Sequence, residues 1–266
     1  MGGVCQSVTD RDTHRFFYRE NLCNPCLNFR MPFQFPKCQI LPLPDDQVLL
    51  QIDGRERVRW HFDAKYPRPF FYPFNGPSGE TLTRMGHPGA QNHDHHRSVW
   101  WAHAKVDGED FWGDNTKARI RQTRWLAYSD GDTEAVMATS AGWFNGDGKE
   151  IMEQEMVAAI RPGPEGETFL ELQSTFTSTG APVTLEQSNF GLLAVRMAKG
   201  IATFWGEGQI TSSEGGRGER DERLEHQQAR PRGQVRHDDR QSLVHKLFLQ
   251  GKLEEVRHDD HWDHHH

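Results

Sequence analysis

The chain has 266 residues, of which 35% are hydrophobic and 26% charged, and its formal net charge is -7 at pH 7. This length allows one large β domain or two small ones, and the acidic balance excludes the basic surface typical of nucleic-acid-binding proteins. No run of about 18 apolar residues exists, which excludes a membrane-spanning helix, and the first residues lack the apolar segment of a secretory signal. We therefore expect a cytoplasmic protein that acts on a small molecule, with no membrane or nucleic-acid partner.

Residues 1–39 mix Arg, Asn, Pro, Phe and Cys without a period, and we expect an irregular N-terminal extension there. The segment contains all four cysteines of the chain. Cys23 and Cys26 have the spacing of a zinc knuckle, but Cys5 and Cys38 do not form the second pair that such a site needs. We expect reduced thiols without a metal.

Residues 40–214 alternate short apolar segments with turn residues such as Asp53-Gly54 and Asp107-Gly108, a pattern typical of antiparallel hairpins. Residues 66–73 contain three prolines, which are too closely spaced for a helix or a central strand. The pattern predicts an all-β domain, an antiparallel β-sandwich. The expected strands span residues 47–52, 57–62, 98–106, 120–128, 135–143, 150–161 and 168–177.

Residues 215–266 differ in composition from the rest of the chain. They are rich in Arg, Asp, Gln and His and contain few apolar residues that a core would bury. We expect a disordered tail in which residues 242–256 form a short helix.

One stretch, HPGAQNHDHHRSVWWAH, places five histidines within residues 87–103, and these are His87, His93, His95, His96 and His103. Clustered imidazoles exchange protons or bind metals near neutral pH. In an extended backbone His93 and His95 point to one face and His96 to the other. The neighbouring Arg97 offers a planar fork for a carboxylate, a phosphate or sugar hydroxyls, and tryptophan rings suit the apolar face of a sugar. The ordinary alternative is that the tryptophans and His103 are core or wall residues of a strand.

A metal site is the competing interpretation of the same stretch, with a divalent metal as cofactor in place of none. His93 and His95 have the His-x-His spacing with which β-sandwich metal sites begin. Further ligands would come from His87 or His103 and from later carboxylates. The available glutamates are Glu153, Glu155, Glu171 and Glu186.

The stretches RPFFYPFNGPSGETLTRMGHPGAQNHDHHRSVWWAHAKVDGEDFW, LEQSNFGLLAVRMAKG and ITSSEGGRGE resemble the family named "methane oxygenase PmoA", over about Leu41 to Gly218. That family is similar to the galactose-mutarotase-like β-sandwiches, which handle sugars. The resemblance implies a general acid, His96, and a general base for which only Glu207 and Glu214 suggest themselves. It implies that His93, His95 and Arg97 orient the substrate. The remaining candidates for substrate binding are Arg84, His87, Asn92, Trp101, His103, Asn189 and Arg196.

The tail departs from the family pattern, which continues with further strands, so we expect a frameshifted tail and a sandwich incomplete at its C-terminus. The preferred function is carbohydrate processing by acid–base chemistry, as in an epimerase or a lyase. The alternatives are a metal-dependent oxygenase or hydrolase that uses His93 and His95, and a sugar-binding module without catalysis.

Overall fold

The computed structural model describes residues 34–86, 93–202, 206, 208, 233–235 and 241–247. The chain divides into two compact units, Met1–Phe35 and Pro36–His266, and the described residues other than 34 and 35 belong to the second. The cysteine pair at residues 23 and 26 lies outside the described residues. No helix within the described ranges is long and apolar enough to cross a membrane.

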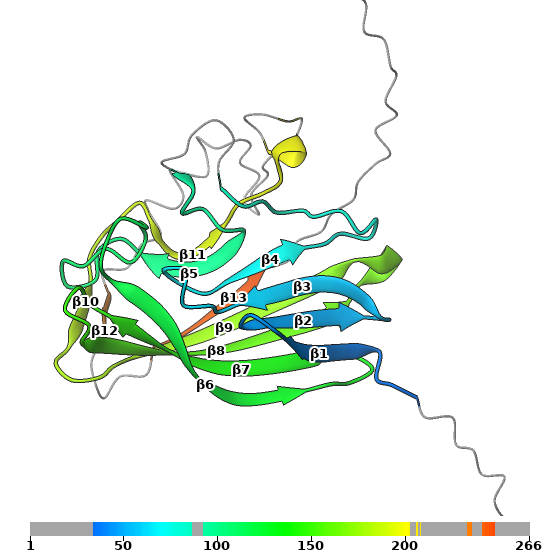
Figure 1. The fold of residues 1–266 in the computed structure, drawn as a ribbon, viewed down its shortest axis with the longest axis horizontal. Helices are drawn as coiled ribbons and strands as arrows, with labels where there is room; N and C mark the ends of the chain where they lie inside the picture. Colours follow the sequence, from blue (N-terminus) through cyan, green and yellow to red (C-terminus); the bar gives the residue numbers. More distant parts are fainter. Residues whose placement is uncertain are drawn as a thin grey trace, which may run out of the picture. The chain divides into compact units, whose positions relative to one another are not determined.

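Two large antiparallel sheets dominate the described residues of the second unit (Figure 1), which confirms the predicted all-β sandwich. The first sheet contains, in spatial order, β1 (Cys38–Leu43), β2 (Gln47–Ile52), β3 (Arg55–His61), β4 (Phe70–Phe74), β5 (Val99–His103) and β11 (Gly191–Val195). The second contains β13 (Gln241–Leu247), β9 (Thr168–Ser178), β8 (Glu150–Pro162), β7 (Ala135–Phe144) and β6 (Arg119–Ser129). A separate pair joins β10 (Val183–Leu185) to β12 (Gly233–Val235).

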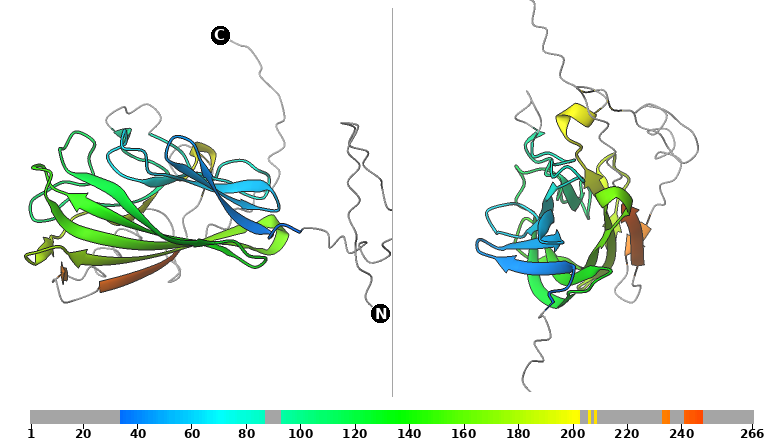
Figure 2. Two further views of the ribbon diagram at one scale, coloured as in Figure 1. Left: turned by 60° about the horizontal axis from the view of Figure 1, so that its bottom comes forward. Right: turned by 90° about the vertical axis from the view of Figure 1, so that its right-hand side faces the viewer.

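The core lies between the two sheets, which Figure 2 shows as facing layers. Strand alternation sends one set of side chains inward from each sheet, as in the buried–partly buried pattern of β2. Trp101 of β5, Trp143 of β7 and Phe176 of β9 meet in this core, with ring centroids 5.8 Å apart in both contacts that Phe176 makes. Cys38 is also buried here, and burial raises the pKa of its thiol.

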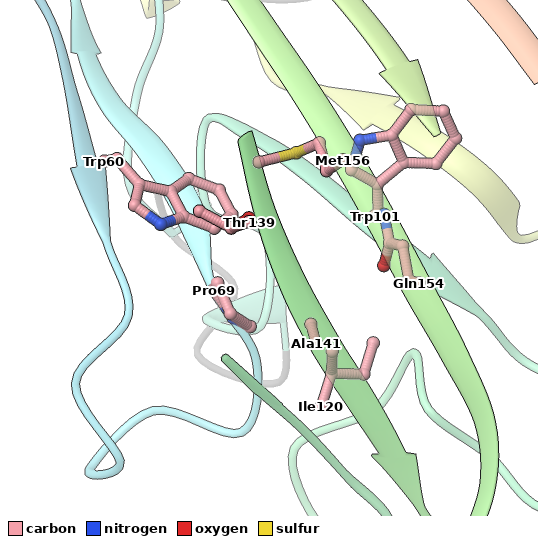
Figure 3. Close-up of a pocket in the computed structure, with 8 residues that line it drawn as sticks. All are labelled: Trp60, Pro69, Trp101, Ile120, Thr139, Ala141, Gln154 and Met156. Carbon is pink, nitrogen blue, oxygen red and sulfur yellow. The ribbon is translucent and has the colours of Figure 1, made fainter. Parts of the chain in front are cut away.

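A small cavity remains in this core, lined by residues of both sheets (Figure 3). Its volume is about 10 Å³, which is no more than one water molecule needs. One lining side chain, Trp60, donates its indole N–H to Gln122 Oε1 at 2.7 Å. The cavity is therefore too small to hold a substrate.

Three expectations about the strands were wrong. The proline-rich segment contributes a central strand, β4, because the residues that pair with its neighbours are Phe70, Phe71 and Phe74, while Pro73 falls outside the paired register and needs no N–H there. The expected helix at 242–256 is a strand over residues 241–247, which pairs with β9. The segment expected to be irregular to residue 39 ends in β1, which starts at Cys38.

Candidate functional site

The side chains of β5 point alternately to the two faces of the first sheet. Trp100 and Ala102 point away from the core between the sheets and pack with Phe70 and Trp112 in a second apolar cluster on the outer face of the first sheet. Trp101 points the opposite way, into the core. The structure therefore does not bring Trp101, a predicted substrate contact, together with the outer-face residues.

His103 also lies apart from the neighbouring histidines, at the far end of β5. It is 8% exposed, and its Nε2 is 2.8 Å from the carbonyl oxygen of Glu186. This contact ties the end of β5 to the segment that precedes β11. His103 has the position of a wall residue.

The histidine cluster consists of His93, His95 and His96, whose rings contact one another directly. Ring centroids are 5.2 Å apart for His93 and His96, 4.3 Å for His95 and His96, and 5.8 Å for His93 and His95. The prediction that His93 and His95 face away from His96 required an extended backbone, but the backbone here is not extended. The His96 N–H donates to the His93 carbonyl at 3.0 Å, and the resulting turn gathers the three imidazoles.

Backbone hydrogen bonds between three segments fix the position of His96. The Gly86 N–H donates to the His96 carbonyl at 2.7 Å, and the Ser98 N–H donates to the Arg84 carbonyl at 3.0 Å. The Arg196 N–H donates in turn to the Ser98 carbonyl at 2.7 Å. These bonds bring Arg196, from the segment after β11, next to a histidine one hundred residues earlier in the chain.

The imidazole of His96 is buried and neutral. It is 5% exposed, stacks on Trp100 at 5.8 Å and 25°, and accepts a hydrogen bond at Nδ1 from Arg196 Nε at 3.0 Å. Burial and the positive charge of Arg196 lower the pKa of His96 to about 2. A general acid must carry a proton near neutral pH, so His96 does not fit the acid role that the resemblance implied.

Arg97 belongs to a second group, the arginine–aspartate network of Arg68, Arg97 and Asp114. Both terminal nitrogens of Arg97 donate to the Asp114 carboxylate, at 3.0 and 2.5 Å, and its guanidinium lies over the ring of Tyr66 at 5.4 Å. The fork predicted to orient a substrate is thus occupied by a side chain of the protein. Arg97 instead holds the histidine turn against the 110–118 connection.

Arg68 completes this network from the connection before β4. It is 1% exposed and donates to Asp114 Oδ1 at 3.1 Å and to the carbonyl oxygens of Phe111, Trp112 and Gly113. Burial lowers its pKa to about 10. Burial alone would raise the pKa of Asp114, but the hydrogen bond from Arg97 and the charges of Arg97, Arg68 and His95 lower it.

The remaining predicted residues are placed as follows. Arg84 is partly buried, which lowers its pKa, and donates to the Gly86 carbonyl, while Asn189 is exposed just before β11. Four predicted residues lie outside the described part of the chain, namely His87, Asn92, Glu207 and Glu214.

A metal centre has no complete ligand set in the part of the chain that the structure describes, where no group of three or more His, Cys, Asp or Glu side chains could hold an ion. Three of the four predicted carboxylate ligands have other partners. Glu153 pairs with Arg124, Glu171 pairs with Arg161, and Glu186 accepts from the Gly108 N–H at 3.2 Å. Because His87 is outside the described residues, a metal held by His93 and His95 stays a prediction.

Sequence reasoning missed Arg68, Asp114 and Phe190. Phe190 is 49% exposed, and its ring lies 5.5 Å from that of Trp112. Arg68 stands alone in a proline-rich segment, and Asp114 stands in a turn-like one, so neither carries a local signal. The dipeptide Asn189-Phe190 was visible in the sequence, but only its asparagine was singled out.

Comparison with known proteins replaces the earlier family expectation. Residues 47–264 match the model of a family of unknown function, DUF6807, a range that includes the tail. The expected resemblance to the methane oxygenase PmoA family is therefore wrong, and the roles that it implied have to stand on geometry. No curated protein and no solved structure matches the chain.

Proposed function

Since the chain belongs to the family of unknown function DUF6807, we propose from its geometry that the histidine cluster binds a carbohydrate and changes it by acid–base chemistry. One observation carries this proposal. Three imidazoles contact one another on the outer face of the first sheet, and the innermost of them is stacked on Trp100. Imidazoles exchange protons near neutral pH, and neighbouring aromatic rings suit the apolar face of a sugar.

The three histidines differ in environment, which supports different roles. His96 is buried, neutral and bound to Arg196, so we assign it to positioning. His93 and His95 are only partly buried, which leaves them accessible to a ligand. The charge of His95 contributes to the lowered pKa of Asp114, so the carboxylate lies within electrostatic reach of this imidazole. We assign the general acid to His95 and the base to His93, the two imidazoles of the cluster that are only partly buried.

The test compares the wild-type protein with His95→Gln and with a matched control, His61→Gln. His61 is another partly buried histidine, but it contacts Phe70 and the Tyr72 carbonyl rather than the cluster. Calorimetric titration with glucose, galactose, mannose and xylose measures binding, and proton NMR of the same mixtures detects new isomers or elimination products. We expect His95→Gln to reduce the rate of conversion by at least about 100-fold and His61→Gln to keep the wild-type rate.

The possible outcomes separate the proposal from its alternatives. Saccharide binding without conversion in the wild type supports a binding module and contradicts the catalytic part. No binding of any saccharide contradicts the proposal as a whole. Conversion that survives in both His93→Gln and His95→Gln places the chemistry elsewhere.

A further inference from the structure

Phe190 is an exposed aromatic ring held in a fixed position beside the histidine cluster. Its backbone N–H donates to Ser188 Oγ at 3.0 Å, and its carbonyl accepts from the Ala104 N–H at 3.0 Å. The ring lies against Trp112 at 5.5 Å and 36°, with 49% of the residue exposed. The backbone and one ring face are therefore supported, while much of the ring remains open to solvent.

A continuous series of ring contacts joins Phe190 to the cluster. Trp112 contacts Phe190 on one side, and on the other it contacts Trp100 at 5.2 Å and the ring of His96 at 6.5 Å. Trp112 is 8% exposed and Trp100 is fully buried. The exposed aromatic surface of this series is consequently concentrated on Phe190, one indole ring away from His96.

Two polar groups accompany the aromatic series, one enclosed and one exposed. The indole N–H of Trp100 is buried and has no hydrogen-bond acceptor among the residues that the structure describes. A buried donor of this kind is costly unless a small partner such as a water molecule satisfies it. Asn189, next to Phe190 and exposed, adds an amide that can both donate to and accept from hydroxyl groups.

We propose that Phe190 is a stacking platform for a second sugar ring, so that the ligand of this site is an oligosaccharide rather than a free monosaccharide. The inference rests on the proposed carbohydrate function and adds the substrate class to it. One ring occupies the histidine cluster, and the next lies with its C–H face on Phe190 and its hydroxyls toward Asn189. An isolated exposed phenylalanine needs no explanation, but one that is fixed beside clustered imidazoles has the properties of a recognition residue.

Two other exposed aromatics provide the contrast. Trp125 and Tyr128 lie on the edge strand β6, where Trp125 contacts Phe62. Tyr128 is more exposed than Phe190, at 59% against 49%. Tyr128→Ala is thus a matched control that removes an exposed aromatic ring from another part of the sandwich.

The experiment uses the full chain and pairs of mono- and disaccharides, namely glucose with cellobiose and maltose, xylose with xylobiose, and mannose with mannobiose. Titration calorimetry gives the ratio of the two affinities within each pair. We expect the wild type to bind one disaccharide about tenfold more tightly than its monosaccharide. Phe190→Ala should bring this ratio close to one, Phe190→Trp should preserve it, and Tyr128→Ala should leave it unchanged.

The outcomes distinguish the two proposals. An unchanged ratio in Phe190→Ala, or an equal loss of affinity for both members of a pair, overturns the platform while leaving the histidine site standing. A wild-type ratio near one for every pair also overturns it. The absence of all saccharide binding overturns the proposed function and the platform together. Circular dichroism of each variant confirms that the fold is kept.

Discussion

Replacing Asp114 by asparagine removes one negative charge from the arginine–aspartate network and changes little else in shape. The carboxylate accepts two hydrogen bonds from Arg97, at 3.0 and 2.5 Å, and two from Arg68, both at 3.1 Å. The Arg68 side chain is 1% exposed and that of Asp114 is 26% exposed. In the variant, the buried guanidinium of Arg68 therefore keeps only uncharged acceptors.

Breaking a buried ion pair by removing one partner costs roughly 3–5 kcal/mol. Asp114 is partly accessible to water, and asparagine retains one acceptor oxygen, so we place the loss near the lower limit, at about 3 kcal/mol. For a domain of this size such a loss lowers Tm by roughly 6–12 °C. Because the folded pKa of Asp114 lies below 3.8, its contribution is present at neutral pH and is lost as the pH falls below that value.

Urea unfolding at pH 7, followed by tryptophan fluorescence, measures the free energy of unfolding of each variant. Asp63→Asn is the control, since Asp63 also pairs with a cation, Lys65 at 2.8 Å, but on the surface. We expect no measurable change there. Arg97→Lys, which keeps the charge but loses the two-pronged geometry, should fall between the two. A loss below about 0.5 kcal/mol in Asp114→Asn would show that the carboxylate does not stabilise the buried arginines.

Three further predictions follow from burial and geometry. The pKa of His96 is about 6.5 in the unfolded chain but about 2 in the folded protein, so its contribution to stability is complete only above pH 6.5. Lowering the pH from 7 to 5 should therefore reduce the free energy of unfolding by about 2 kcal/mol. Urea unfolding at pH 7 and pH 5 measures this difference, which should be smaller in His96→Gln. Trp101→Leu should cost about 3 kcal/mol in the same assay yet leave saccharide affinity unchanged, because the ring lies in the core; a selective loss of affinity would contradict that placement. Gly191→Ala should lower the free energy of unfolding by about 2 kcal/mol or more, because the added Cβ would collide with the His103 ring and because the φ of Gly191, 148°, is rarely adopted by other residues. An unchanged Tm of this variant in a thermal scan would contradict the expected collision.

Turn residues and alternation were sufficient to predict most of the sandwich. Residues 47–52 were expected as a strand and are β2. The expected strand at 120–128 is one residue short at each end, and those at 135–143, 150–161 and 168–177 are one residue short at the C-terminal end only. These segments are bounded by Gly, Asp and Pro, whose backbone preferences are local. β4 was missed as a strand because a pairing register, which decides where a proline is tolerated, is not a local property.

The site was predicted in part, for the same reason. Histidines that are adjacent in sequence carry their own signal, and the cluster of His93, His95 and His96 lies within the predicted stretch. Their roles depended on contacts with Arg196 and Trp100, which the backbone of three separate segments creates. The partner of Arg97 lies 17 residues away, and the partner of Arg68 lies 46 residues away. No periodicity in the sequence encodes such pairs.

The most direct test of the histidine site is an NMR titration of protein labelled with ¹⁵N at its histidines, using the saccharide that calorimetry finds to bind most tightly. We expect the imidazole resonances of His93 and His95 to shift with a common dissociation constant while those of His61 stay unchanged. We also expect His96 to keep the spectrum of a neutral imidazole down to pH 5. Saccharide binding that leaves His93 and His95 unshifted would show that the ligand binds elsewhere, and a protonated His96 at pH 5 would show that its imidazole is not buried and neutral.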